Sequence, residues 1–375
     1  MVAGQGGDGA LSRCDEVSTK VPMTKLVERL PRRNTQAVTI GDVARRAGVS
    51  TMSVSRVING KGGVGEETRG RIQAVIREMN YSPSPAAQGL ASAVAARIGL
   101  LYTAPSGAYL SAFLLGTLDE ISRTGDSLVL QRCDTPGELK QAIDKLLTEA
   151  VDGVVLPPPL CDSAEALSLL AKAGKPVVAV ATGRDDDRSL TVRVDDYAGA
   201  CAMTEHLIAL GHRRLGFIGG DEQQAAAGLR LQGFKDVMAK AGHKPVVIER
   251  GDYSYRSGIE AATRIFDAAA PPSAIFASND DMASAAVSVA HRRGLDVPGD
   301  VTIVGFDDSL LAATTWPELT TVHQPIGEMA RTAMELLLRH IRNERSGVSS
   351  PDRHTRLDYS LVIRDSDGPP KSSEV

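Results

Sequence analysis

The spacing of apolar residues divides the chain into a short helical segment and a long segment of alternating strands and helices. Between residues 38 and 81, apolar side chains recur every three or four positions, which predicts three short helices. We expect Thr39 to cap the first helix together with Asp42, and Gly48 to end it. Ser50 would cap the second helix. A helix, a short glycine-containing turn and a second helix make a helix-turn-helix motif.

The second of these helices, from about Thr51 to Ile58, would present its outer face to the major groove of DNA. Residues 38–92 hold seven Lys and Arg against four Asp and Glu, a net charge of +3, whereas the whole chain carries −4. DNA affinity is therefore expected at this end alone. Arg56 can donate two hydrogen bonds to guanine, and Asn59 would contact a phosphate or sugar. The alternative is a small helical bundle with a solvated polar face.

Residues 82–96 read as a linker that can become a short helix. Ser84 would be its N-cap, with Pro85 at the first helical position, but so short a helix is not stable alone in water. It would need a second copy of the chain and DNA. Leu90 would then serve as a wedge in the minor groove, unless it packs under the next domain. The candidate DNA-contacting residues are Thr39, Ser50, Thr51, Met52, Ser53, Ser55, Arg56, Asn59, Tyr81, Ala87 and Leu90.

Two motifs in this segment, DVARRAGVSTMSVSRVIN and NYSPSPAAQGLAS, resemble the headpiece of the lactose-repressor (LacI) family of bacterial transcription regulators. The resemblance implies that Thr51 and Met52 are the variable base readers, Arg56 the near-constant one, and Leu90 the side chain inserted into the minor groove. The chain departs from the family pattern at Ser84, where Asn is usual. It also departs at Gln88, where many members have Arg, and this change removes a possible cation from the minor groove.

From Arg97 onward, apolar strands alternate with amphipathic helices. The expected strands are 98–103, 127–133, 153–159, 176–182, 214–220, 245–251, 274–280 and 301–307. Near-continuous apolar strands separated by helices predict parallel sheets covered on both faces. Two groups of four strands predict two doubly wound lobes, a periplasmic-binding-protein-like core. Residues 319–325, a helix from about 326 to 342, and residues 355–365 would carry the chain between the lobes.

Polar and aromatic residues follow the ends of these strands, where ligands of doubly wound sheets bind. The candidate effector-binding residues are Tyr109, Phe113, Arg230, Tyr253, Asn279 and Asp307. Carboxylate and amide groups bridge hydroxyls, and aromatic faces pack against the C–H surfaces of sugars, so the set suits a neutral sugar. The family resemblance covers about residues 98–365, and it implies effector contacts for Arg230, Tyr253, Asn279 and Asp307.

Each of these residues also has a purely structural alternative. Asp307 could cap a helix, Arg230 could pair with a carboxylate of its own lobe, and Tyr253 could be packing. Asp195 and Asp280 are equally well explained as helix caps. We expect Trp316 to pack where the chain crosses between the lobes.

The sequence lacks the GxSxG and HExxH patterns and any GxGxxG that opens a helix after a strand, and its histidines show no metal spacing, so neither an enzyme nor a metal or cofactor site is expected. The prediction is a ligand-responsive repressor that binds a pseudo-palindromic operator as a homodimer. Its effector would be a sugar, since 4% aromatic residues weakly disfavours a purine pocket with stacked rings. The alternatives are a nucleobase-responsive, corepressor-type regulator of the same fold and a periplasmic-type solute-binding protein.

The expected domain boundaries follow from these patterns. Residues 1–37 would be a disordered extension, 38–81 the headpiece, 82–96 the hinge, 97–365 the core, and 366–375 a disordered tail. Four scattered cysteines fit a reducing cytoplasm better than a disulfide framework. No apolar run approaches 18 residues and no signal peptide is recognisable, so a cytoplasmic protein without membrane contact is expected.

Overall fold

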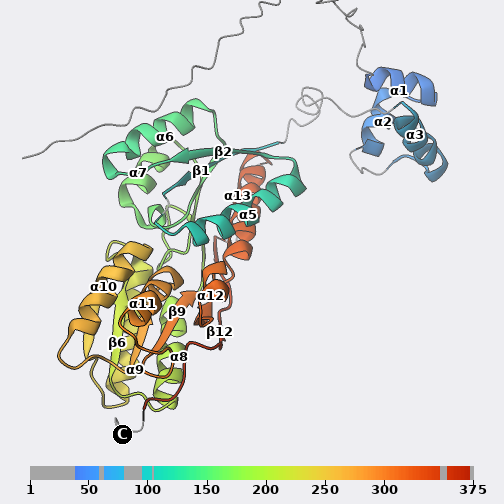
Figure 1. The fold of residues 1–375 in the computed structure, drawn as a ribbon. Coiled ribbons are helices and arrows are strands. Elements are labelled where there is room, and N and C mark those ends of the chain that lie inside the picture. The colour runs from blue at the N-terminus through green and yellow to red at the C-terminus, as the bar shows by residue number, and fades with distance from the viewer. Residues whose placement is uncertain (1–38, 59–62, 80–94, 104, 347–352, 372–375) are drawn as a thin grey trace, which may run out of the picture. The chain divides into compact units, whose positions relative to one another are not determined.

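The computed structural model describes residues 39–58, 63–79, 95–103, 105–346 and 353–371. The chain divides into two compact units, residues 1–91 and 92–375 (Figure 1). The expected hinge at 82–96 therefore falls mainly outside the described residues, as does the extension at 1–37. Among the described residues, no helix is long and apolar enough to span a bilayer.

The first unit contains the three short helices that the spacing predicted. They are α1 (Ile40–Ala47), α2 (Thr51–Ile58) and α3 (Glu66–Glu78). Thr39 and Asp42 form the expected capping box, and Gly48 ends α1 with a left-handed φ of 65°. Ser50 accepts a hydrogen bond from the backbone N–H of Ser53 at 3.2 Å. The apolar faces meet in a core of Val43, Ala44, Ala47, Val54, Val57, Ile72 and Val75.

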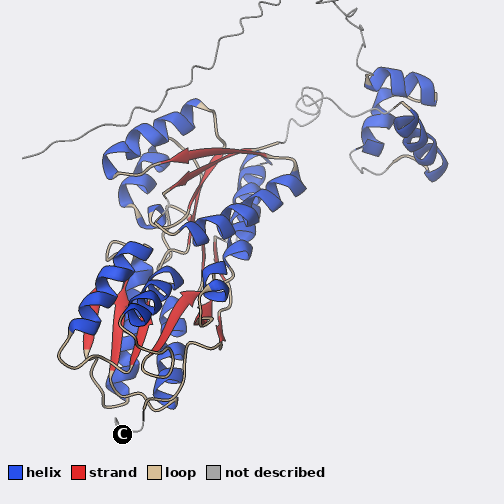
Figure 2. Cartoon of the chain, in the orientation of Figure 1, coloured by secondary structure: helices blue, strands red, loops and turns tan. Residues whose placement is uncertain are grey.

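The N-terminal lobe of the second unit is built on a parallel sheet of six strands in the order β11-β5-β4-β3-β1-β2. Its strands are β1 (Arg97–Tyr102), β2 (Ser127–Arg132), β3 (Gly153–Leu156), β4 (Val177–Val180), β5 (Leu190–Arg193) and β11 (His354–Arg356). Helices α5 (Gly107–Thr124) and α13 (Ile326–Ser346) cover one face, and α6 (Leu139–Thr148) and α7 (Ala164–Lys172) cover the other (Figure 2).

Helices α5 and α13 pack closely because two glycines meet where they approach. A Cβ atom built on Gly116 would lie 2.2 Å from the carbonyl oxygen of Gly327, so a larger residue at position 116 would push the helices apart. The short helical turns η1 (Pro136–Glu138) and η2 (Leu160–Asp162) complete this lobe.

The C-terminal lobe has a second sheet of six strands, in the order β12-β10-β9-β8-β6-β7. Its strands are β6 (Leu215–Gly219), β7 (Val247–Arg250), β8 (Ala274–Ala277), β9 (Thr302–Asp307), β10 (Thr320–His323) and β12 (Ser360–Val362). Only β12 runs antiparallel to its neighbour. Helices α8 (Asp196–Ala209) and α9 (Ala225–Lys240) cover one face, and α10 (Tyr255–Asp267) and α11 (Asp280–Arg292) the other, with the short α12 (Leu310–Thr314) after β9.

Both sheets share one topology. In each, the second strand lies outside the first and the next three follow on the other side, which is the flavodoxin-like 2-1-3-4-5 order. The chain crosses between the lobes three times, after β5, after β10 and after β11. The predicted fold class, a helix-turn-helix region followed by two doubly wound parallel sheets, is confirmed.

The sequence analysis missed β5 because its residues Leu190–Arg193 alternate apolar with polar and form no continuous apolar run, between a polar loop and the aspartates at 195 and 196. The segment 355–365 carries the chain between the lobes as predicted, and it contributes a short strand to the sheet of each lobe. Trp316, expected to pack at a crossover, is 79% exposed instead.

The expected disordered tail from residue 366 is wrong for residues 366–371, which lie against the C-terminal lobe. The hydroxyl of Ser366 accepts from the backbone of Thr320 at 2.9 Å and donates to the carbonyl of Ile303 at 2.6 Å. His206 contacts the carboxylate of Asp367 at 2.7 Å. The segment is polar, so its composition indicated a tail, but its polar groups find partners that only the folded lobe provides.

Removing this segment should destabilise the core. We expect a chain ending at Asp365 to lose roughly 3 kcal/mol or more of unfolding free energy, because several buried hydrogen-bond partners disappear together. The melting temperature would fall by about 5 °C or more. A chain ending at Lys371 is the matched control and should melt like the full chain in differential scanning calorimetry. Equal melting temperatures for all three chains would contradict a structural role for residues 366–371.

Candidate functional site

A cavity lies between the two lobes of the core, at the carboxyl ends of both sheets. Thr103 follows β1, Pro157 follows β3 and Ala181 follows β4 in the N-terminal lobe, while Tyr253, Asn279, Asp307 and Gln324 come from strand ends of the C-terminal lobe. Its volume is about 50 Å³, below the several hundred Å³ usual for ligand pockets. A ligand the size of a sugar or a base therefore requires the lobes or the lining side chains to move apart.

Arg230, on α9, is a buried cation at the floor of this cavity. Its side chain is 5% exposed and donates to the carboxylate of Asp196 at 2.8 Å and to the carbonyl of Ser278 at 2.6 Å. A second carboxylate, Asp307, lies 3.7 Å away. The guanidinium carbon stands 3.6 Å from the centre of the Phe306 ring. Burial alone would lower the pKa of Arg230, but the facing carboxylates more than offset this and raise it.

Asp307 ends β9 and receives a hydrogen bond from the side-chain amide of Gln324 at 2.6 Å. Burial raises the pKa of Asp307 well above its usual value, against the opposing effect of Arg230. Burial likewise raises the pKa of Asp196, again opposed by Arg230. One guanidinium thus faces two desolvated carboxyl groups, so its charge is already met within the protein and it is not free to pair with an anionic ligand.

Tyr253 follows β7 and is held by its backbone. It adopts a left-handed φ of 70°, and its carbonyl oxygen accepts a hydrogen bond from the side-chain amide of Asn279 at 2.9 Å. Gly220 makes room for the ring, because a Cβ at that position would lie 2.1 Å from the ring carbon Cζ. Asn279 also caps α11 by accepting from the backbone N–H of Met282 at 3.0 Å.

On the other side of the cavity, Tyr109 lies in the first turn of α5. The N-cap of this helix is Ser106, whose hydroxyl accepts from the backbone N–H of Tyr109 at 3.1 Å. The ring of Tyr109 stacks on that of Phe113, with centroids 6.3 Å apart. Phe113 itself is fully buried in the core of the lobe and does not line the cavity. Phe113 packs behind the ring of Tyr109 and supports it.

Three polar atoms of the lining are buried without a hydrogen-bond partner: the hydroxyls of Tyr109 and Tyr253 and the carbonyl oxygen Oε1 of Gln324. Burial raises the pKa of both tyrosines, so both hydroxyls keep their protons at neutral pH. Buried polar groups are normally paired, and an orphan in a cavity points to a partner from outside the protein. The cavity therefore offers two hydroxyls and one amide oxygen to a ligand.

Two hydrogen bonds join the lobes on either side of the cavity. The hydroxyl of Ser106 donates to Asp281 on α11 at 2.7 Å. Asp162 of the N-terminal lobe accepts from the backbone N–H of Ala225 at 2.9 Å, which is the first residue of α9. The N-cap of α9, Gln224, makes no capping bond with its side chain, so the other lobe supplies the cap.

The predicted DNA-contacting residues of the first unit lie on and beside α2. Thr51, Met52 and Arg56 are exposed, with Met52 at 65%, whereas Ser53 and Ser55 are half-buried. Thr39 and Ser50 are occupied as helix caps. Asn59, Tyr81, Ala87 and Leu90 lie outside the described residues. The exposed set is the kind of face that a recognition helix presents to base edges.

Comparison with known proteins agrees with both units. The model for bacterial regulatory proteins of the lacI family matches residues 39–84, and that for a periplasmic binding protein-like domain matches residues 204–366. The HTH-type transcriptional repressor PurR of Photobacterium profundum is 34% identical over 339 residues, covering 88% of this chain and 98% of that protein. The chain belongs to the lacI family of bacterial regulatory proteins.

Solved structures of the lacI family resemble the chain over most of its length. A complex of the transcriptional regulator CelR with cellobiose has a TM-score of 0.67 at 30% identity, covering 88% of this chain and 100% of that chain. A lac repressor dimer bound to operator and the anti-inducer ONPF has a TM-score of 0.69 at 28% identity, covering 88% and 99%. The protein is a ligand-responsive, DNA-binding transcription regulator of this family.

The structure brings together five of the six predicted effector-site residues, since Tyr109, Arg230, Tyr253, Asn279 and Asp307 all line the cavity. The sequence analysis missed Gln324, Asp196 and Ser106. Gln324 and Asp196 stand at points where the chain crosses between the lobes, and the position after a strand end was the signal that could have found them. The structural alternatives also hold in part, because Arg230 pairs with Asp196 and Asp195 caps α8.

Closure of the lobes should depend on Gly183. A Cβ at this position would lie 2.7 Å from backbone and side-chain carbons of Ala225 in the other lobe. We expect Gly183→Ala to hold the lobes farther apart, and hence to lengthen the distance between spin labels placed at Lys145 and Lys240, measured by double electron–electron resonance. Gly137→Ala is the control, since nothing lies within 4 Å of its Cβ. An unchanged distance in Gly183→Ala would show that the contact does not limit closure.

Proposed function

We propose that the protein is a transcriptional repressor whose operator affinity is controlled by a small neutral ligand bound in the cavity between the lobes. The observation that carries the proposal is the set of three unpartnered polar atoms, on Tyr109, Tyr253 and Gln324, at the carboxyl ends of both sheets. A bound ligand would give these atoms partners. A ligand that binds one arrangement of the lobes more tightly shifts the protein toward that arrangement.

Within this function, we propose a nucleobase that acts as corepressor, in place of the sugar that the sequence analysis favoured. Relatives named PurR support the change. So does the lining, in which Pro105, Leu110, Pro157, Ala181 and Ala226 supply apolar walls, while polar groups such as Arg230 and Asn279 already have partners within the protein. A planar ring with polar edges satisfies such a cavity, whereas a sugar carries hydroxyls on most of its carbons and leaves more of them unpaired.

A sugar remains the second candidate, because the structure of a relative was solved as a complex with cellobiose. The low aromatic content of the chain does not decide between the two classes. Only two aromatic rings are needed at the site, and the fold places Tyr109 and Tyr253 there although the whole chain is 4% aromatic.

We also propose that two copies bind a pseudo-palindromic operator, since one helix-turn-helix unit reads one half-site and twofold symmetry supplies the other. Two large apolar side chains of the C-terminal lobe support this. Leu310 on α12 is 77% exposed, and Trp316 just after α12 is 79% exposed. A second copy of the chain would remove them from water. Residues 38–81 would be the headpiece, and residues 82–96 the hinge.

Arg56→Ala should weaken binding to the operator by about 1–3 kcal/mol, because a bidentate contact to guanine is lost. The operator would first be recovered by selection from random-sequence DNA. Fluorescence anisotropy with that duplex and with a scrambled one then measures the change, and the scrambled duplex should lose far less affinity. Equal losses on the two duplexes would mean that Arg56 contacts only phosphate.

Tyr253→Phe should weaken ligand binding about 3- to 10-fold without lowering stability, since the hydroxyl that is removed has no partner within the protein. Thermal shifts with adenine, guanine, hypoxanthine, xanthine, ribose, glucose and cellobiose identify the ligand first, because binding raises the melting temperature. Isothermal titration then gives the affinities. Tyr255→Phe is the matched control, since that hydroxyl bonds to Ser288 at 2.7 Å away from the cavity. Wild-type affinity in Tyr253→Phe would show that the Tyr253 hydroxyl does not contact the ligand. Binding of sugars alone would contradict the proposal that the ligand is a nucleobase.

A further inference from the structure

The turn that follows β9 is strained and carries a residue of the cavity. Asp307 has a φ of 118° and Asp308 a φ of 54°, both in the region that favours glycine. Two successive aspartates in this conformation persist only where the surroundings fix them. The groups that fix this turn therefore decide where the carboxylate of Asp307 points.

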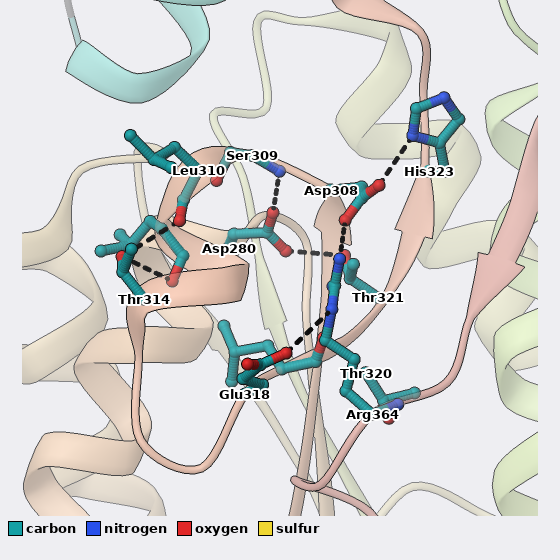
Figure 3. A network of polar contacts seen from close by, with 12 residues as sticks. Asp280, Asp308, Ser309, Leu310, Thr314, Glu318, Thr320, Thr321, His323 and Arg364 are labelled. Atoms are coloured by element: carbon teal, nitrogen blue, oxygen red, sulfur yellow. Dashed lines mark hydrogen bonds and ion pairs between the residues drawn. The ribbon is translucent and has the colours of Figure 1, made fainter.

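Three sets of contacts hold the turn, and Figure 3 shows those of Asp308 and Ser309. Gln324 donates to Asp307 at 2.6 Å from its side chain and at 3.3 Å from its backbone. His323 and Arg364 contact the carboxylate of Asp308 at 2.8 Å and 2.5 Å. The backbone N–H of Ser309, the next residue, donates to Asp280 at 2.7 Å.

Asp280 is a fully buried member of this network. It is the first residue of α11, and its other oxygen accepts from the hydroxyl of Thr321 on β10 at 2.6 Å. The carboxyl group of Asp280 thus joins α11, β10 and the turn after β9. Position 305 on β9 admits only glycine, because a Cβ there would lie 2.3 Å from Oδ1 of Asp280.

Capping of α11 does not account for Asp280. Asn279 occupies the cap position and bonds to the N–H of Met282, whereas both oxygens of Asp280 are directed to Ser309 and Thr321. Asp280 does not line the cavity either. Its carboxylate therefore serves the turn rather than the helix or the ligand.

We propose that Asp280 is a positioning residue of the effector cavity, which fixes Ser309 and thereby aims Asp307 at the ligand without touching it. The proposal rests on the proposed function of the cavity. It adds that ligand affinity depends on a clamp outside the cavity lining, formed by the hydrogen bonds of Asp280 with Ser309 and Thr321.

The clamp needs the shape of the side chain rather than its charge. An ionised carboxylate accepts both hydrogen bonds. Burial raises the pKa of Asp280 to about 7, while the bonds from Thr321 and Ser309 act to lower it. A protonated carboxyl can donate to the hydroxyl of Thr321 and still accept from Ser309. An asparagine amide can do the same. Asp280→Asn should therefore preserve the clamp, and Asp280→Ala should abolish it.

The first measurement needs no ligand. Hydrogen exchange of the full chain, followed by mass spectrometry over residues 301–316, should show faster exchange in Asp280→Ala than in the wild type, and wild-type exchange in Asp280→Asn. Thr321→Val removes one bond while keeping the side-chain size, and it should give an intermediate increase even if Asp280→Ala fails to fold. Wild-type exchange in Asp280→Ala or Thr321→Val would overturn the clamp.

The second measurement titrates each variant with the compound that stabilises the wild type, from the panel of nucleobases and sugars above. We expect Asp280→Ala to bind about 10-fold more weakly or worse, and Asp280→Asn to bind within about 3-fold of the wild type. Faster exchange with undiminished affinity would overturn the positioning role. If no compound of the panel bound the wild type, the proposed effector classes would fail, while the exchange data would still decide the clamp.

Discussion

The interior of the core depends on the groups that pair with one buried cation, the guanidinium of Arg230. Removing a guanidinium from water is costly unless carboxylates and hydrogen-bond acceptors replace its hydration. Arg230 receives this compensation from Asp196, from the carbonyl of Ser278 and from the nearby Asp307. Asp196 stands at the first crossover between the lobes, and Asp307 at the end of β9. The contacts of Arg230 with Asp196 and Asp307 thus hold the first crossover, the end of β9 and the floor of the cavity in one arrangement.

This arrangement explains how a change in the cavity can reach distant parts of the protein. Gln324, which binds Asp307, lies on the second crossover, directly before α13. At the other end of the N-terminal lobe, the chain enters the core at Ala96, whose backbone N–H donates to the carboxylate of Asp126 at 2.7 Å. Arg342 of α13 binds the same carboxylate at 2.9 Å. Helix α13 therefore runs from the cavity side of the N-terminal lobe to Ala96, where the chain that arrives from the helix-turn-helix unit enters the core. A shift of the lobes that moves α13 would also move that entry point.

Several features were readable from the sequence because they depend on neighbours along the chain. The capping box of Thr39 and Asp42, the end of α1 at Gly48 and the periodic core of the three helices are local patterns. The strands of the core were recognisable as apolar runs for the same reason. Residues placed directly after those runs, such as Asn279 and Asp307, were identified as site candidates because parallel strands bring their carboxyl ends to one edge. Strand β5 was missed because its sequence, LTVR, alternates apolar and polar residues and contains no apolar run.

The sequence by itself therefore determined most of the elements, the fold class, the family and five of the residues that line the cavity. Only the tertiary structure decided which side chains are partners. It placed Phe113 behind Tyr109, paired Arg230 with Asp196, brought Gln324 to Asp307, and fastened residues 366–371 to the C-terminal lobe. The physical reason is that local patterns fix which face of an element is apolar, whereas the partner of a buried polar group can lie anywhere in the chain. Such groups find their partners only when distant segments pack together.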